Sequence, residues 1–374
     1  HSRGTRALVL GLLAAAYPLA QFFGAPLLGG WSDRVGRKRV LLVSLAGTMA
    51  GYVLFALGVL SASLPLLFLS RLLDGFTGGN ISTAMSAIAD LSDEKSKAKN
   101  FGLIGMAFGL GFILGPYLGG KLSDPAVVPW FSYATPFWFA ALLALANIAL
   151  VQWRFEETLR APSRIEVSWL TGFRNLGRAL QLPAVRSMFV VVFLLTFGFT
   201  FFTQFFQVFL IEKFSFTQSA IGDLFAFTGV WIALTQGVLA RLVAARMSPR
   251  QVLVVALLLL GLTFPLLLLP ERPWGLYVVL PFIAIFNGLI QPNATAVISD
   301  LSDPRSQGEI LGINQSVQSL AFAVPPVVSG LVVNISLDLP IILAALSCLA
   351  AWAVFLVFIF IPHARTRVFH ERAS

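Results

Sequence analysis

Two charged residues inside a long apolar run are the place where this sequence could do chemistry. Arg71 and Asp74 lie three residues apart in the run 64–90, so a helix would place them on one face. A charge in hydrocarbon costs about 3 kcal/mol on insertion scales, and such residues usually face a cavity and pair with one another. A carboxylate in that position could bind and release a proton. Asp74 and Arg71 are therefore candidate proton-coupling residues, and a purely structural ion pair is the alternative.

Most other reactive chemistry finds no support in the sequence. The single Cys348 lies in the last apolar run, and the three histidines, His1, His363 and His370, lie outside the runs. These positions supply no disulfide framework, no thiolate or histidine metal site and no Ser-His-Asp arrangement. We expect no catalytic residues, no metal, no cofactor and no enzymatic activity.

Composition indicates a membrane protein. Hydrophobic residues make up 57% of the 374 residues and charged residues 11%, against about 25% charged in soluble domains. Windows of about 20 apolar residues predict an all-α polytopic membrane protein. We expect eleven spans, near 6–31, 38–60, 64–90, 97–121, 132–153, 187–211, 219–241, 250–270, 274–297, 308–334 and 338–361.

The basic residues predict which loops face the cytoplasm. Of the 26 Lys and Arg residues, 20 fall in one alternating set of loops, five fall in the other set with the N-terminal segment, and Arg71 lies in a span. The positive-inside rule places the first set in the cytoplasm. These loops are 33–39, 91–99, 154–186, 241–250, 301–307 and the C-terminus. Because the net charge of +9 comes from short loops and not from one continuous face, we expect no nucleic-acid partner.

The turn after the first span has a distinctive sequence. Gly29-Gly30-Trp31-Ser32-Asp33-Arg34-Val35-Gly36-Arg37-Lys38-Arg39 resembles the loop signature of the major facilitator superfamily of transporters, with Trp31 where Leu is usual. The resemblance implies a role in conformational gating; the alternative is a positive-inside loop with no further role. Asp90 and Asp300, at the ends of paired helices, are two further gating candidates unless they are simply solvated helix ends. The candidate gating residues are Gly29, Asp33, Arg34, Gly36, Arg37, Lys38, Asp90 and Asp300.

An internal repeat indicates two related halves. Asp90-Leu91-Ser92-Asp93 recurs 210 residues later as Asp300-Leu301-Ser302-Asp303, and the same offset relates Pro116 to Pro326 and Gly120 to Gly330. Parallel repeats of six helices build the superfamily that the turn resembles. We expect an N-terminal bundle over 1–153 (helices 2–6 of 12), a cytoplasmic linker over 154–186 and a C-terminal bundle over 187–374 (helices 7–12). The first helix of the fold is then missing from this sequence.

Two further elements resemble the same superfamily. Arg71-x-x-Asp74-Gly75 is similar to an Arg-x-x-Gln-Gly element of the fourth helix, which is associated with proton handling. The glycine-rich run that ends in Gly115-Pro116-Tyr117-Leu118-Gly119-Gly120 resembles a fifth-helix element of the family's exporters. Helix packing alone is the alternative explanation of the glycines. The antiporter-helix candidates are Gly111, Gly115, Pro116, Gly119 and Gly120.

Amide side chains near the span centres are the candidates for a substrate cavity. With 34 Phe residues in the chain, an apolar, aromatic cavity with scattered amides suits amphipathic organic molecules. The candidates are Asn80, Asn147, Gln204, Gln207, Gln236, Asn287, Gln291, Asn293, Asn314 and Gln318.

The resemblance is closest to the drug:proton antiporter branch, which includes tetracycline-efflux-like carriers. It implies proton-coupled efflux of drug-like molecules by alternating access, in a monomer in a bacterial inner membrane. The implied partners are the lipid bilayer, a small-molecule substrate and protons. Two alternatives stay open: an uptake symporter or facilitator for a sugar or small metabolite on the same fold, and a non-transporting membrane receptor or scaffold.

Overall fold

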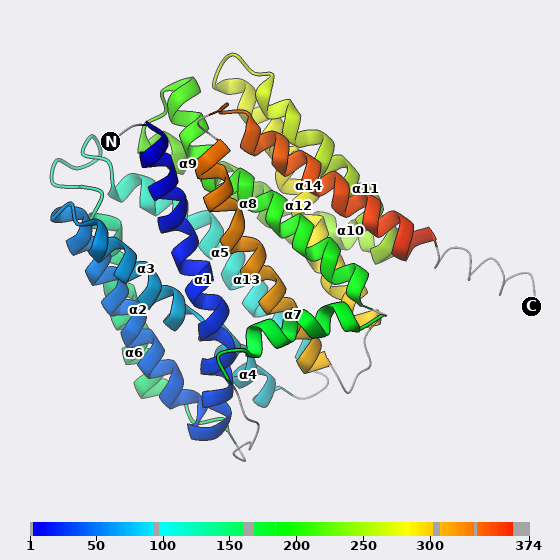
Figure 1. Cartoon of the computed structure of the whole chain (residues 1–374), viewed down its shortest axis with the longest axis horizontal. Coiled ribbons are helices and arrows are strands. Elements are labelled where there is room, and N and C mark those ends of the chain that lie inside the picture. Colours follow the sequence, from blue (N-terminus) through cyan, green and yellow to red (C-terminus); the bar gives the residue numbers. More distant parts are fainter. Residues whose placement is uncertain are drawn as a thin grey trace, which may run out of the picture. The chain divides into compact units, whose positions relative to one another are not determined.

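The structure, a computed structural model, describes residues 3–92, 97–159, 168–183, 185–301, 307–332 and 335–361. Helices form its regular secondary structure, and the described residues contain no strand (Figure 1). Among the described residues, eight helices are long and apolar enough to cross a membrane. The prediction of an all-α polytopic membrane protein is thereby confirmed, while the expected total of eleven spans stays a prediction.

The first part of the chain forms six helices. They are α1 (Arg3–Val35), α2 (Arg37–Leu60), α3 (Leu64–Gly78), α4 (Ile81–Asp90), α5 (Lys97–Leu122) and α6 (Thr135–Arg154). The sequence predicts one span over 64–90, but the structure divides it at Gly79-Asn80 into α3 and α4. The division falls where Gly79 meets the backbone of α1, so closely that a Cβ there would lie 2.4 Å from the nitrogen of Ala25.

The remaining helices follow a short amphipathic helix, α7 (Thr171–Gln181). They are α8 (Arg186–Phe214), α9 (Gln218–Leu234), the π-helical turn η1 (Thr235–Leu239), α10 (Ala240–Ala244), α11 (Pro249–Thr263), the 3₁₀ turn η2 (Phe264–Leu268), α12 (Trp274–Asp300), α13 (Gln307–Val332), α14 (Leu339–Phe355) and the π-helical turn η4 (Leu356–Phe360).

Local sequence explains where several helices begin. Helices α3, α6, α11 and α14 carry a proline in their first turn, where its missing N–H breaks no helical hydrogen bond. Ser248 and Gln251 also form a reciprocal capping box at the start of α11.

The helices group into two compact units. Unit 1 comprises His1–Leu8, Asn175–Phe216 and Leu224–Ser374, and unit 2 comprises Val9–Arg174 and Thr217–Asp223. In unit 2, α2 packs against α3 and α6 (Figure 1). In unit 1, α8 packs against α13 and α14, and α11 packs against α12 and α14. The bundle and linker boundaries drawn from the sequence stay predictions.

A row of glycines on α2 brings it close to α3. A Cβ at Gly47 would lie 2.3 Å from Cγ2 of Thr77, and one at Gly51 would lie 2.8 Å from Cβ of Asp74. Small residues at four-residue spacing let membrane helices approach at backbone distance. This contact places Asp74 against the backbone of α2 within unit 2.

Candidate functional site

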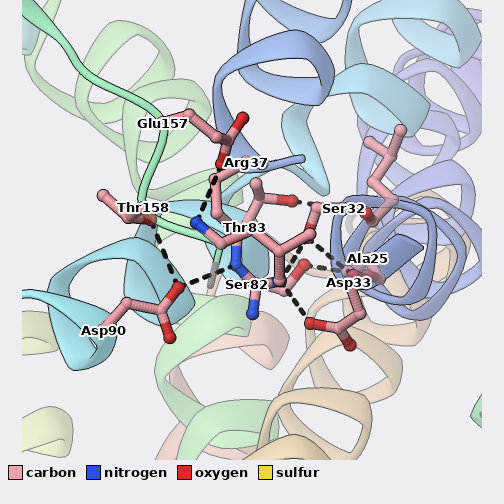
Figure 2. A network of polar contacts seen from close by, with 12 residues as sticks. Ala25, Ser32, Asp33, Arg37, Ser82, Thr83, Asp90, Glu157 and Thr158 are labelled. Carbon is pink, nitrogen blue, oxygen red and sulfur yellow. Dashed lines mark hydrogen bonds and ion pairs between the residues drawn. The ribbon is translucent and has the colours of Figure 1, made fainter. Parts of the chain in front are cut away.

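The basic turn between α1 and α2 is organised around one buried arginine, Arg37 (Figure 2). Its side chain is 7% exposed and forms an ion pair with Asp33, at the end of α1. Its Nη1 donates to Oγ of Ser32 at 2.7 Å, and its Nε donates to Oδ2 of Asp90 at 3.1 Å. The last turn of α1, the first residue of α2 and the last residue of α4 thus meet at one guanidinium. Three of the predicted gating residues lie together.

Glu157 closes the network from the segment after α6 (Figure 2). Its carboxylate accepts the backbone N–H of Arg37 at 2.8 Å and of Lys38 at 3.2 Å. Those N–H groups open α2, where the helix dipole favours a negative charge. The adjacent Thr158 donates its hydroxyl to Oδ2 of Asp90 at 3.2 Å. The end of α6 is therefore tied to both α2 and α4.

The backbone contacts also determine the acidity of Glu157. Burial alone would raise the pKa of its carboxyl, but hydrogen bonds from the backbone of Leu159, Arg37, Lys38 and Thr158 stabilise the charged form and outweigh burial. The pKa of Glu157 is consequently lowered from its ordinary value. At neutral pH this residue is a fixed negative charge at the start of α2.

Gly36 is required at its position for two physical reasons. Its φ is +110°, in a region that L side chains rarely adopt. A Cβ there would also lie 2.3 Å from Oε2 of Glu157. The glycine therefore permits the turn and also makes room for the carboxylate that caps α2.

The other predicted gating residues take different positions. Lys38 donates its Nζ to the carbonyl of Gln152 at 2.8 Å. Gly29 lies against Ser82 of α4, Arg34 is exposed, and Asp300 is exposed at the end of α12. Asp90 and its repeat counterpart Asp300 are thus not equivalent. Parts of the predicted cytoplasmic loops, at 93–96, 160–167, 184, 302–306 and 362–374, lie outside the described residues.

Arg71 and Asp74 do not form the ion pair that their spacing suggested. The Arg71 guanidinium lies over the ring of Phe55, 4.4 Å from its centroid, and 5.9 Å from that of Phe137. No carboxylate in the described part of the chain lies within 4.0 Å of it. Asp74 is 4% exposed. Both residues lie on α3, which also packs against Tyr17 of α1 at Gly75 and Gly78.

The glycines of α5 divide into two groups. A Cβ at Gly111, Gly115 or Gly119 would meet no atom of the described residues within 4 Å, so packing against that part of the chain does not require glycine here. Position 120 does require glycine, because a Cβ there would lie 2.6 Å from the carbonyl oxygen of Gln218. Pro116 lies inside the helix, where it removes one backbone hydrogen bond.

The predicted cavity residues include two amides that lack partners. The side-chain oxygens of Asn287 on α12 and Asn314 on α13 are buried and have no hydrogen-bond partner among the described atoms. Asn293 donates to the carbonyl of Leu289 at 2.7 Å. Asn80 and Gln318 are half-buried, whereas the rest are exposed: Asn147, Gln204, Gln207, Gln236 and Gln291.

Phe residues beside the two glutamines of α8 face the core of unit 1. Phe201, Phe202, Phe205 and Phe206 are between 1% and 3% exposed, while Gln204 and Gln207 lie on the exposed face. The aromatic run therefore packs the core and leaves the amides accessible.

Sequence reasoning missed Glu157 and Thr158. Glu157 lies 120 residues from Arg37 along the chain, so no local spacing relates them. The acidic pair Glu156-Glu157 within a basic segment is the one signal that could have drawn attention to it.

Comparison with known proteins gives one family. The model of the Major Facilitator Superfamily matches residues 1–209 and 188–374. The class E tetracycline resistance protein of Escherichia coli is 31% identical over 85% of this chain and 76% of its own length. Human major facilitator superfamily domain-containing protein 10 is 29% identical over 92% of this chain and 75% of its own. The crystal structure of the human organic anion transporter MFSD10 (TETRAN) aligns with a TM-score of 0.72 and 26% identity, covering 92% of this chain and 83% of that one.

Proposed function

Because this chain belongs to the major facilitator superfamily, we propose that it exports amphipathic organic molecules in exchange for protons. The resemblance to that superfamily, with its tetracycline-efflux relatives, is confirmed. The chain is an integral, multi-pass membrane transporter and not an enzyme. The coupling ion, the substrate class and the direction of transport are the proposal.

The observation that carries proton coupling is the environment of Asp74. Asp74 is 4% exposed on α3, and the nearby Arg71 is held over aromatic rings without an ion pair to it. A buried carboxylate without a fixed counter-ion is costly. Proton binding removes that cost, so it changes the relative free energies of conformations that bury or expose the group. Asp74 is our coupling acid, and Arg71 tunes its electrostatic surroundings.

Features of unit 1 support the substrate class. The partnerless oxygens of Asn287 and Asn314 can accept hydrogen bonds, and the exposed Gln204 and Gln207 add further polar groups. An apolar site with a few orienting polar groups suits amphipathic ligands. The names of several relatives associate them with tetracycline resistance.

Charge distribution supports the orientation. We place the Asp33–Arg37–Asp90 network at the cytoplasmic face, because the loops on its side carry 20 basic residues against five on the other. We propose that the network belongs to the gate at that face.

The test is substrate-driven proton movement in liposomes. We would reconstitute the protein, impose a pH gradient and follow lumenal pH while adding ethidium as a lipophilic cation or tetracycline. We expect substrate to release protons from the acidic side in the unmodified protein. Asp74→Asn should reduce the substrate-driven proton flux at least tenfold, because the asparagine amide does not lose a proton in the physiological pH range.

Asp124→Asn is the matched control. Asp124 lies in the loop between α5 and α6 and accepts the backbone N–H of Ala126 at 2.9 Å, a bond that an amide oxygen can retain. Its flux should equal that of the unmodified protein. Substrate flux without proton movement would instead indicate a facilitator and leave Asp74 a structural residue.

A second substrate class has one specific observation in its favour. The aligned human structure is described as an organic anion transporter, and Arg71 is a membrane-embedded cation with no carboxylate within 4.0 Å in the described chain. An anionic substrate could supply that partner. In the same assay, an amphipathic carboxylate probe should then be transported and ethidium should not, and Arg71→Gln should abolish the transport.

A further inference from the structure

A second polar contact lies at the far end of α5. Nζ of Lys121 is 2.8 Å from Oδ2 of Asp223 and donates to Oγ of Ser219 at 2.7 Å. Lys121 follows Lys97, the first residue of α5, by 24 residues, which is about 36 Å of helix. Because α5 begins seven residues after Asp90, this contact lies at the opposite end of α5 from the Asp33–Arg37–Asp90 network, and we infer that the two face opposite sides of the membrane.

Backbone packing under the ion pair is very close. A Cβ at Gly120 would lie 2.9 Å from Cα of Gly222, and one at Gly222 would lie 2.9 Å from the carbonyl oxygen of Pro116. Helices approach this closely where they present small residues, and here both present glycine. The start of α9 therefore packs at backbone distance against the end of α5. We call this glycine contact the seal, and the polar contact lies next to it.

The chain passes from one unit to the other within α9, directly after the residues of this contact. Residues 217–223 group with α5 in unit 2, whereas α9 from Leu224 onward belongs to unit 1. The ion pair is partly solvated, with side-chain exposures of 27% for Lys121 and 46% for Asp223. Partly exposed ion pairs are weak, so this one suits a contact that must form and break repeatedly.

We propose that Lys121, Asp223 and Ser219 form an outer latch, which holds the start of α9 on α5 while the outer face is closed and releases it for substrate exit. The inference rests on the alternating-access export proposed above. Gly120 and Gly222 provide the seal, and the ion pair determines how readily it opens. The charged network at the other end of α5 contains none of these residues.

The first test locks the latch with a disulfide. In a Cys348→Ala background, Lys121→Cys combined with Asp223→Cys should oxidise readily in liposomes. Oxidation should reduce ethidium export at least tenfold, and reduction should restore it. Lys121→Cys alone and Asp223→Cys alone are the controls, and oxidant should not affect them. A pair that does not oxidise, or that transports equally well when oxidised, would overturn the latch.

Charge exchange tests the ion pair without a covalent bond. Lys121→Asp and Asp223→Lys should each lower export several-fold, because each places like charges together. The double exchange should recover more than half of the activity, since the attraction is restored with its polarity reversed. A double variant no better than either single one would contradict the ion-pair latch.

The two proposals fail in different ways. Unmodified protein that moves neither ethidium nor protons would contradict drug:proton export. The latch would then be tested by the rate at which a membrane-impermeant maleimide, added outside, modifies the reduced cysteine pair. Asp90→Asn, which weakens the contact at the other end of α5, should favour the closed latch and slow this modification. An unchanged modification rate would contradict the latch.

Discussion

At the scale of single residues, Glu157 explains features of the basic turn that charge alone does not. Its two oxygens accept separate backbone N–H groups, from Arg37 and Lys38. An amide offers only one acceptor and no charge for the helix dipole. The turn is thus stabilised by a residue far away in the chain. The absence of a side chain at Gly36 leaves room for the carboxylate of that residue, Glu157.

We predict a pH-dependent stability contribution from Glu157. Because its pKa is lowered on folding from an ordinary 4.5, its contribution is present above that value and is lost as the pH falls through the folded-state pKa. Glu157→Gln should therefore lower the melting temperature at pH 7 and make progressively less difference as the pH falls below about 4.5. Thermal unfolding in detergent across this pH range measures it.

Glu156→Gln is the control for that measurement. Glu156 is an exposed neighbour of the same charge, so its substitution should leave the melting temperature nearly unchanged at every pH. An equal effect of the two substitutions, or a Glu157→Gln effect independent of pH, would argue against the helix-capping role.

Local sequence predicted which residues matter in the turn but not how they are joined. Gly36, Arg37 and Asp33 belong to one short motif, which its resemblance to the superfamily's loop signature singled out. Arg37 and Asp90 are 53 residues apart, and Arg37 and Glu157 are 120 apart. Such contacts depend on helix packing and have no local signature. The Arg71–Asp74 ion pair, by contrast, was expected from local spacing but does not form. The Arg71 guanidinium packs on the ring of Phe55 instead.

At the scale of elements, the contact between α2 and α3 positions the coupling acid. Glycine in a helix usually costs about 1 kcal/mol relative to alanine. At Gly51 that cost is offset, because the absence of a Cβ lets α3 approach with Asp74 against the α2 backbone.

We predict that Gly51→Ala destabilises the protein by about 1–3 kcal/mol. The new Cβ would lie 2.8 Å from Cβ of Asp74, so α3 must shift, and substrate-driven proton flux should fall as well. Chemical unfolding and the liposome assay measure the two effects.

Gly111→Ala provides the comparison, since a Cβ there would meet no described atom within 4 Å. It should be neutral or slightly stabilising, with normal flux. If both substitutions behave alike, the α2–α3 approach is not what positions Asp74.

Element positions followed well from hydropathy, because a membrane span must satisfy its backbone internally over a fixed length. The start of α2 at Arg37 and the end of α8 at Phe214 are within a few residues of expectation. The division at Gly79 was not predicted, because it reflects close contact with α1. Helix-period patterns carry no such information.

At the scale of the whole molecule, two polar contacts stand at opposite ends of α5. If transport alternates between them, weakening one should populate conformations in which the other is closed. The two sites would then be linked without touching.

We predict that Asp90→Asn speeds oxidation of the Lys121→Cys/Asp223→Cys pair several-fold. The substitution weakens the contacts of Asp90 with Arg37 and Thr158, which favours opening at the network and closure at the outer latch. Oxidation rates in liposomes measure the shift.

Asp300→Asn is a suitable control, because Asp300 occupies the repeat-equivalent position but is exposed at the end of α12. Its oxidation rate should match that of the parent pair. An Asp90→Asn rate that is unchanged or slower would contradict the linkage.

The π-helical turn η1 has a geometric consequence for everything that follows it in its helix. Thr235, its first residue, donates its hydroxyl to the carbonyl of Trp231 at 2.7 Å, and the helix continues directly into α10. A π turn accommodates one more residue than an α turn in the same stretch. Deleting a single residue between 235 and 239 would let the ladder close as α-helix and leave Arg241 on nearly the same face, because the π turn had absorbed that residue. This helix can therefore lose one residue at the π turn without reassigning the faces of α10, whereas a deletion elsewhere in the helix would rotate them.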